Sequence, residues 1–251
     1  MSFSSLDAYR VAPGLDVFIV PRFAQDVLGM DPTQIQLALE TNYPARGAGD
    51  KIVPGIVQWV DGDNKALHYR GNAIKRGKIW LQRLPTEHGV SKYGYTGWQW
   101  NIVPATATVS KCGEMLPIAD SYDQWVERLG YPRANHYIVT KYVDGRHNIG
   151  FHSDKPNDIE AGSLITVVKT GAHGRPFELC FPGQEKSPFF SRVLLPGTAV
   201  IMTLEANLQT KHGVPVVQQA GPSGSIVFRT IKTVVPPSQV AKELKKRKRV
   251  A

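Results

Sequence analysis

The chain has little cysteine and no long apolar run, and these absences exclude several classes of protein. Cys112 and Cys180 are the only cysteines among 251 residues, too few for a disulfide framework and without the paired spacing of a zinc site. No stretch of 18 apolar residues exists, so no membrane span is expected. The first residues, MSFSSLDAYR, lack a basic segment followed by an apolar core, which argues against a secretory signal. We therefore expect an intracellular protein.

Positive charge is concentrated at the C-terminal end of the chain. The formal net charge is +9, and residues 238–251 carry six basic side chains against Glu243. Their KKRKR run is typical of nuclear-import signals and nucleic-acid tethers, and equally of a solvated, disordered tail. The remainder keeps about +4, a modest bias toward phosphate-bearing partners such as DNA or RNA. With 42% hydrophobic residues the chain can bury a normal core, and we expect a monomer.

Three residues in the C-terminal half have the character of metal ligands. His152 and Asp154 stand two positions apart, and on a strand such residues point to the same side. His212 follows sixty residues later. Two imidazoles and one carboxylate can occupy one face of an octahedral Fe(II) and leave the other face open for a cosubstrate and O2. A lone H-x-D also arises by chance, so the surroundings of this one matter.

Short β-rich runs separated by glycine and proline surround this motif, as in an antiparallel double-sheet barrel. Further toward the N-terminus, Asp31-Pro32-Thr33 is a helix-start signal, and Gly130 closes a second predicted helix. The predicted strands are residues 17–20, 52–60, 78–81, 135–142, 163–168, 177–181, 198–203 and 225–229, and the predicted helices are residues 34–41 and 121–129.

From roughly Gly97 to Val234 the chain resembles the AlkB family of Fe(II)- and 2-oxoglutarate-dependent dioxygenases. The motifs that carry the resemblance, in family order, are YVDGRHNIGFHSD, a Gly-Ser before a strand, a Gly-Ala-x-x-Arg segment, PGTAVIMTLEANLQTKHGVP and SIVFRTI. The resemblance implies a mainly β, α+β fold with a double-stranded β-helix (jelly-roll) core. We expect an N-terminal extension and substrate-recognition lid over residues 1–96, the core over residues 97–237 and the basic tail over residues 238–251.

The resemblance also implies an activity. His152, Asp154 and His212 would hold Fe(II), with 2-oxoglutarate and O2 as cosubstrates. Decarboxylation of 2-oxoglutarate to succinate and CO2 would accompany hydroxylation of a substrate C–H bond. On an N-methylated base of DNA or RNA, the hydroxymethyl product would collapse to formaldehyde and the unmodified base. The alternative is a 2-oxoglutarate-dependent hydroxylase of a free nucleotide, a protein side chain or a small molecule.

The cosubstrate contacts that the resemblance implies depart from the family pattern. They are Arg229, Tyr142, Thr140 and Ser225. The family usually has asparagine at the position of Thr140, and arginine at the position of Ser223. That arginine normally pairs with the distal carboxylate of 2-oxoglutarate, and serine does not replace a planar bidentate partner. Either Arg229, Lys141, Lys169 or another cation takes this role, or a different oxo acid is used.

The substrate contacts that we expect lie before the barrel and at one strand end. Tyr95, Trp98 and Trp100 are interleaved with glycine where the family's lid grips the substrate nucleotide. Aromatics there would stack on an unpaired or flipped base, unless Trp98 and Trp100 belong to a core strand. The basic residues between positions 70 and 78 would hold phosphates or form a solvated loop. Arg175 resembles a family arginine close to the substrate pocket, and otherwise would be a surface residue at a strand end.

Overall fold

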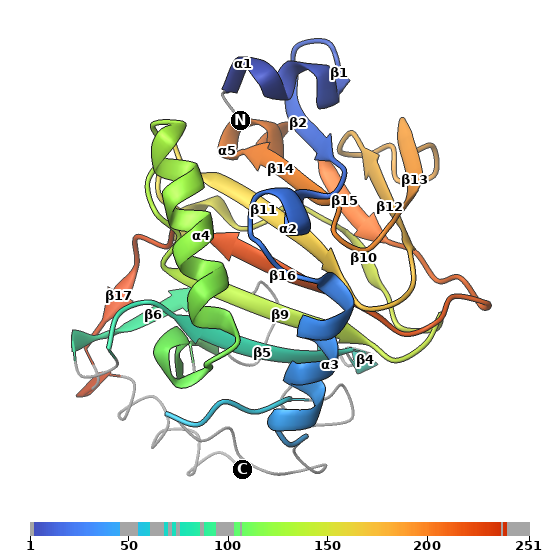
Figure 1. The fold of residues 1–251 in the computed structure, drawn as a ribbon. Helices are drawn as coiled ribbons and strands as arrows, with labels where there is room; N and C mark the ends of the chain where they lie inside the picture. The colour runs from blue at the N-terminus through green and yellow to red at the C-terminus, as the bar shows by residue number, and fades with distance from the viewer. Residues whose placement is uncertain are drawn as a thin grey trace.

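Two facing β-sheets form the body of the protein (Figure 1). The structure is a computed structural model, and it describes residues 3–45, 55–60, 68–69, 72–73, 76–85, 88–93, 103–105, 107–236 and 238–239. The larger sheet has eight strands in the order β1-β2-β14-β11-β16-β9-β5-β8. In sheet order these strands are Arg10–Ala12, Leu15–Val20, Ala199–Thr203, Leu164–Thr170, Ser223–Arg229, His136–Tyr142, Gly77–Gln82 and Ala107–Thr108.

The smaller sheet has four strands in the order β10-β15-β12-β13. Its strands, in sheet order, are Ile149–His152, Lys211–Val214, Arg175–Cys180 and Phe190–Leu194. From β9 onward the chain passes repeatedly from one sheet to the other, since β10, β12, β13 and β15 belong to the small sheet and β11, β14 and β16 to the large one. This is the double-stranded β-helix, so the predicted mainly β fold with a jelly-roll core is confirmed. Strands β1, β2 and β5, which precede residue 97, belong to the same large sheet.

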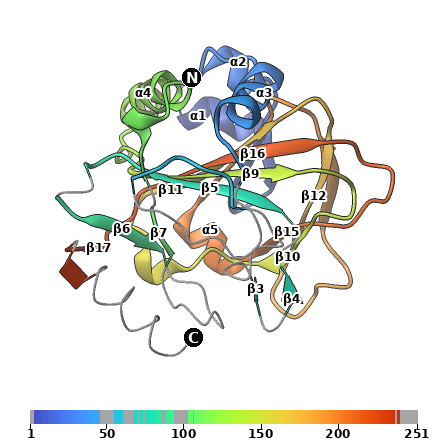
Figure 2. The same cartoon turned by 90° about the horizontal axis from the view of Figure 1, so that it is seen from below.

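The helices that precede residue 130 cover the face of the large sheet that lies opposite the small sheet, whereas the helix that begins at Leu204 lies on the side of the small sheet (Figure 2). The α-helices α1 to α5 are Phe3–Leu6, Phe23–Asp26, Pro32–Asn42, Met115–Arg128 and Leu204–Gln209. Short 3-10 helices η1, η4 and η5 are Asp7–Tyr9, Val109–Lys111 and Pro156–Asp158, and the remaining strands β3, β4, β6, β7 and β17 are His68–Tyr69, Asn72–Ala73, Val90–Tyr93, Val103–Pro104 and Val234–Val235. Among the described residues, no helix has the length and apolar character needed to cross a membrane.

Local sequence signals explain both long helices. The Asp31 carboxylate accepts hydrogen bonds from the backbone N–H of Thr33 and Gln34, at 2.8 and 2.9 Å, which caps α3 at the predicted start. Helix α4 begins at Met115, six residues before the predicted start. Pro117 does not prevent this earlier start, because it falls in the first turn, where a backbone N–H would make no helical hydrogen bond. It ends before Gly130, whose φ of 81° is the left-handed conformation predicted for a closing glycine.

The strand predicted over residues 52–60 is not formed in its described part, residues 55–60. Residues 55–60 were expected to complete a strand that begins at residue 52. Trp59 and Val60 form only isolated bridges, to Ala45 and Lys78. The Trp59 indole instead donates a hydrogen bond to the Leu39 carbonyl at 3.0 Å, so helix packing determines the conformation of this segment.

Two apolar layers lie on the two faces of the large sheet. The outer layer, toward the helices, contains Phe228, whose ring stacks on Tyr122 of α4 with centroids 4.3 Å apart. The inner layer, between the sheets, contains Val227. Because side chains alternate along a strand, Ser225 and Arg229 of β16 share the inner face with Val227. Polar side chains thus project into the space between the sheets, where the functional site is found.

Candidate metal centre

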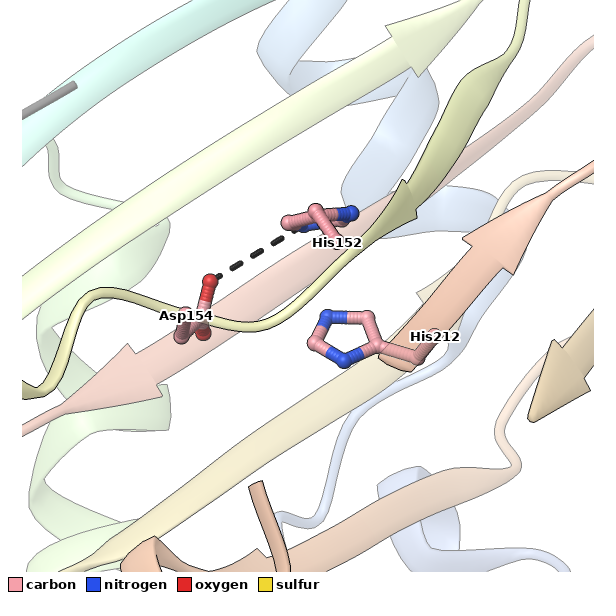
Figure 3. A group of neighbouring side chains, drawn as sticks. All are labelled: His152, Asp154 and His212. Carbon is pink, nitrogen blue, oxygen red and sulfur yellow. Dashed lines mark ion pairs between the residues drawn. The ribbon is translucent and has the colours of Figure 1, made fainter. Parts of the chain in front are cut away.

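Three side chains at one end of the jelly roll bring their ligand atoms together (Figure 3). His152, at the end of β10, is the register partner of His212 on β15. Asp154 lies two residues beyond the end of β10, not on the strand as its spacing had suggested. The ligand atoms of these residues all lie within 4.8 Å of one another, and His152 Nε2 is 3.9 Å from Asp154 Oδ1.

A side-chain clamp fixes the position of Asp154. The Asn207 amide accepts a hydrogen bond from the Asp154 backbone N–H at 2.7 Å and donates one to the Asp154 carbonyl at 2.8 Å. The Ser153 hydroxyl donates to the Thr210 carbonyl at 2.6 Å. Asn207 is in α5, immediately before the strand that carries His212, so the clamp ties two of the three ligand-bearing segments together. No local sequence motif indicates this role of Asn207.

The imidazoles of His152 and His212 differ in their hydrogen bonds and in their packing. Nδ1 of His152 lies 2.9 Å from the Gly150 carbonyl, and in a neutral ring it donates that hydrogen bond, which leaves the Nε2 lone pair on the side of Asp154. The ring of His212 is stacked on Phe177 with centroids 6.0 Å apart. Its Nδ1 is buried and has no hydrogen-bond partner in the described part of the chain.

Electrostatics hold the three residues in the protonation states that metal ligands need. Burial alone would raise the pKa of Asp154, but Arg229 and the two histidines outweigh it and lower that pKa to about 2. Burial lowers the pKa of His212. It also lowers the pKa of His152, with a further contribution from His212, although 39% of the His152 side chain is exposed. A carboxylate and two neutral imidazoles at neutral pH fit a divalent iron.

Arg229 is the nearest charged partner of this centre. Its Nη2 lies 2.6 Å from Asp154 Oδ2, and both side chains are buried. The sequence predicted that Arg229 contacts 2-oxoglutarate, and that role stays a prediction. His136, its register partner on β9, is fully buried, and burial together with Arg229 lowers its pKa to about 3. A neutral histidine therefore lies beside the ion pair, at a position that sequence reasoning missed.

A polar row crosses the inner face of the large sheet away from the metal centre. Lys78 on β5 pairs with Thr140 on β9, Thr140 with Ser225 on β16, and Ser225 with Lys169 on β11. All four side chains are buried. Two of the predicted cosubstrate contacts, Thr140 and Ser225, thus stand side by side. Tyr142, the third, is one inner-face position further along β9, opposite Ser223.

Arg175 is not a surface residue. It is 0% exposed, and its guanidinium donates hydrogen bonds to the backbone carbonyls of Asp144, Gly145 and His147. These carbonyls belong to the loop that joins β9 to β10, the strand that carries His152. The guanidinium also lies 5.0 Å from the Tyr142 ring centroid. Arg175 therefore holds the loop in place through its backbone carbonyls, and its predicted substrate contact stays a prediction.

The predicted substrate-binding aromatics Tyr95, Trp98 and Trp100 lie outside the described residues. Of the basic residues that precede them, Arg76 donates a hydrogen bond to the Asn148 carbonyl at 2.6 Å, next to β10. Lys78 is buried in the inner row and does not belong to a solvated basic loop.

No protein-family model matches the chain, and no curated protein is similar to it in sequence. Among solved structures, the chain is similar to that of OsALKBH1, with a TM-score of 0.45 and 11% sequence identity over 87% of this chain and 98% of that one. The geometry of the site, not this likeness, carries the functional interpretation.

Proposed function

We propose that the protein is an Fe(II)- and 2-oxoglutarate-dependent dioxygenase of AlkB type. The observation that carries the proposal is the triad of His152, Asp154 and His212, whose ligand atoms lie within 4.8 Å of one another at the end of a jelly roll. When bound, Fe(II) with 2-oxoglutarate and O2 supplies the oxidising power to hydroxylate a C–H bond, with succinate and CO2 as coproducts. The protein's task is then to hold the ligands and to position one substrate carbon.

The residues around the triad have separate tasks in this proposal. Arg229 keeps Asp154 ionised and oriented, because it pairs with one carboxylate oxygen and leaves the other on the side of His152. Asn207 fixes the backbone of Asp154. His152, Asp154 and His212 would hold the metal, and three protein ligands would leave coordination positions for the oxo acid and O2.

We propose alkylated bases in DNA or RNA as the substrate class. The basic tail over residues 238–251 and the positive net charge support a phosphate-bearing partner. Tyr95, Trp98 and Trp100 would stack on the base, with Arg175 near the pocket. The competing substrate class is a free nucleotide, a protein side chain or a small molecule. Because Thr140 and Ser223 depart from the family pattern, the test below includes this class.

The test measures both coproducts on matched substrates. The full chain, loaded with Fe(II) without oxygen and then given 2-oxoglutarate and air, is incubated with N-methylated oligonucleotides and with the same sequences unmethylated. We expect succinate and formaldehyde in equal amounts with at least one methylated oligonucleotide, and neither with His152→Ala. Succinate that rises with a peptide or small-molecule pool but with no oligonucleotide would move the substrate to the competing class. No succinate with any pool would contradict the dioxygenase itself.

The proposed base-stacking contact has its own test. Base stacking on an aromatic ring contributes about 1–3 kcal/mol, so Trp98→Ala or Tyr95→Ala should weaken oligonucleotide binding by roughly ten- to a hundredfold. Trp98→Phe keeps a stacking face and should recover most of the affinity. Removing the residues after Pro237 should lower both the affinity and its salt dependence while leaving iron binding intact. An unchanged affinity in Trp98→Ala and Tyr95→Ala would contradict the assignment of this segment.

A further inference from the structure

Several hydrogen-bond donors converge on Tyr142 at the end of the inner face away from the metal centre. Lys169 Nζ lies 5.3 Å from the Tyr142 ring centroid, and Arg175 Cζ lies 5.0 Å from it. Ser223 is the register partner of Tyr142, and the Ser225 side chain hydrogen-bonds the phenol. We call these five residues the Tyr142 cluster. It gathers two cations and three hydroxyl groups in a buried space.

Three donor groups of this cluster, on Lys169, Ser223 and Arg175, lack hydrogen-bond acceptors among the described residues. Lys169 is 2% exposed, and its ammonium makes no hydrogen bond or ion pair with any residue that the structure describes. The one charged group that shifts its pKa is the like-charged Arg175. The Ser223 hydroxyl and Arg175 Nε are buried without hydrogen-bond partners in the same described part. Buried donors without acceptors cost stability, so a fold that retains three of them together is suited to an anion.

The other cations on the inner face are placed elsewhere. Arg229 is paired with Asp154, and it stands four residues from Ser225 on β16, about 13 Å along the strand. Lys78 is three strands from Lys169 in the same row, roughly 14 Å across the sheet, and its electrostatic partners include Asp154 and Arg229. Lys141 is on the outer face, where its ammonium lies 4.9 Å from the Trp59 ring centroid.

We propose that Lys169 receives the distal carboxylate of the 2-oxo acid, in an anion site completed by the hydroxyls of Ser223, Ser225 and Tyr142. This inference rests on the proposed function, because it takes the keto-acid end of the same molecule to be held at the metal centre. Lysine on β11 then supplies the charge that Ser223 on β16 does not carry. The Tyr142 cluster is the feature that selects a dicarboxylate over a monocarboxylate oxo acid.

The test compares two oxo acids that differ only at the distal end. The full chain is loaded with Mn(II), which binds such a triad without turnover, and calorimetry measures the affinity for 2-oxoglutarate and for 2-oxopentanoate, which has a methyl group in place of the distal carboxylate. The wild-type protein should prefer 2-oxoglutarate by about ten- to a hundredfold, the effect of one hydrogen-bonded charge pair. Lys169→Met should lose that preference and keep its affinity for 2-oxopentanoate. Lys169→Arg should keep part of the preference.

Matched variants separate the alternatives. Lys141→Met, on the other face of the sheet, should bind both oxo acids like the wild type. The inference is overturned if Lys169→Met keeps the preference, if it weakens both oxo acids equally, or if the preference is lost in Lys78→Met instead. A wild-type protein that binds Mn(II) but neither oxo acid contradicts the proposed function, and the inference with it. A folded Lys169→Met, with a thermal midpoint no lower than the wild type, excludes misfolding as the cause of any loss.

Discussion

The two ends of the inner face differ in how their polar groups are satisfied. At the metal end, Asp154 is paired with Arg229 and clamped by Asn207, and His152 is hydrogen-bonded to the Gly150 carbonyl. At the Tyr142 end, the Lys169 ammonium lies over the Tyr142 ring, and the Ser223 hydroxyl has no hydrogen-bond partner among the described residues. Asp154 and Arg229 at the metal end are as deeply buried as Lys169 and Ser223 at the Tyr142 end, so burial does not explain the difference.

The difference indicates that the two ends are suited to ligands of opposite charge. The metal end supplies anions and lone pairs whose geometry is fixed by the protein, which suits a cation. The Tyr142 end supplies hydrogen-bond donors without acceptors, which suits an anion. A molecule with a metal-chelating end and a distal carboxylate would satisfy both ends at once.

The largest effect should follow removal of a metal ligand. His152→Ala should abolish iron binding, because two ligands cannot replace the facial triad, and it should cost little stability because the His152 side chain is 39% exposed. Iron is measured by mass spectrometry after anaerobic loading and desalting. His147→Ala, in the loop five residues earlier and outside the ligand cluster, is the control and should load like the wild type. Equal loading of both variants would remove His152 from the site.

Breaking the ion pair at the metal end should strongly destabilise the fold. Arg229→Ala leaves Asp154 buried and uncompensated, at a cost of about 3–5 kcal/mol. Urea unfolding of the metal-free protein measures the change. Arg22→Ala removes an exposed pair with Asp26 and should cost less than about 1 kcal/mol. If Arg229→Ala is no less stable than that control, the contrast between the two ends is wrong at its metal end.

Removing the buried cation at the Tyr142 end should stabilise the fold, whereas removing Arg229 should destabilise it. Lys169→Met keeps the length of the side chain and removes a desolvated charge, so the metal-free protein should gain about 1–4 kcal/mol. Burial, with Arg175, lowers the pKa of Lys169 to about 7. The folded state therefore binds fewer protons than the unfolded one between pH 7 and the ordinary lysine pKa, and the gain is full only at and below pH 7. A loss of stability would mean that Lys169 has a structural partner.

The Asn207 clamp should raise the affinity for iron, beyond any contribution that it makes to the stability of the fold. Asn207→Ala frees the Asp154 backbone and should weaken iron binding by about 10–100-fold, measured anaerobically against a competing chelator. Asn135 makes the same pair of backbone hydrogen bonds, at 2.8 and 2.7 Å, with Ile231, which is not one of the three ligand residues. Asn135→Ala is therefore a matched control that should leave iron affinity unchanged. Equal effects in the two variants would reduce the clamp to a general stabilising contact.

The smallest expected effect is on the pH dependence of oxo-acid binding. The distal carboxylate needs a charged Lys169, whose charged neighbours are Arg175 on β12 and, at high pH only, Tyr142 on β9. Above pH 7 the affinity for 2-oxoglutarate should fall by up to roughly tenfold per pH unit. The affinity for 2-oxopentanoate, which reports any change at the metal, should not follow it. Parallel curves for the two oxo acids would place the titration elsewhere.

Sequence reasoning predicted those parts of the site that depend on local spacing. His152 and Asp154 are close in the chain, and the β-rich runs around them became β9, β11, β12, β14 and β16. His212 was named because it lies between two such runs in a recognisable order. The same pattern indicated an antiparallel double-sheet barrel, and the family resemblance specified it as a jelly roll.

Contacts across strands could not be predicted in the same way. The pairing of Arg229 with Asp154, and of Arg175 with the loop carbonyls, depends on which strands neighbour each other and in which register. Lys169 was one of several possible cations until register placed it opposite Ser225 and its alternation with Ile165 and Val167 placed it on the inner face. The Asn207 clamp joins residues 53 positions apart and has no local signature at all.

The most direct test of the central claim is an anaerobic titration of the iron-loaded protein with 2-oxoglutarate, followed by visible absorption. A 2-oxo acid that chelates protein-bound Fe(II) gives a metal-to-ligand charge-transfer band. We expect the band to appear in the wild type, to saturate at one 2-oxoglutarate per iron, and to be absent in His152→Ala. Iron-loaded wild-type protein without the band, or His152→Ala with the band intact, would contradict the claim that this triad is the centre of a 2-oxoglutarate-dependent dioxygenase.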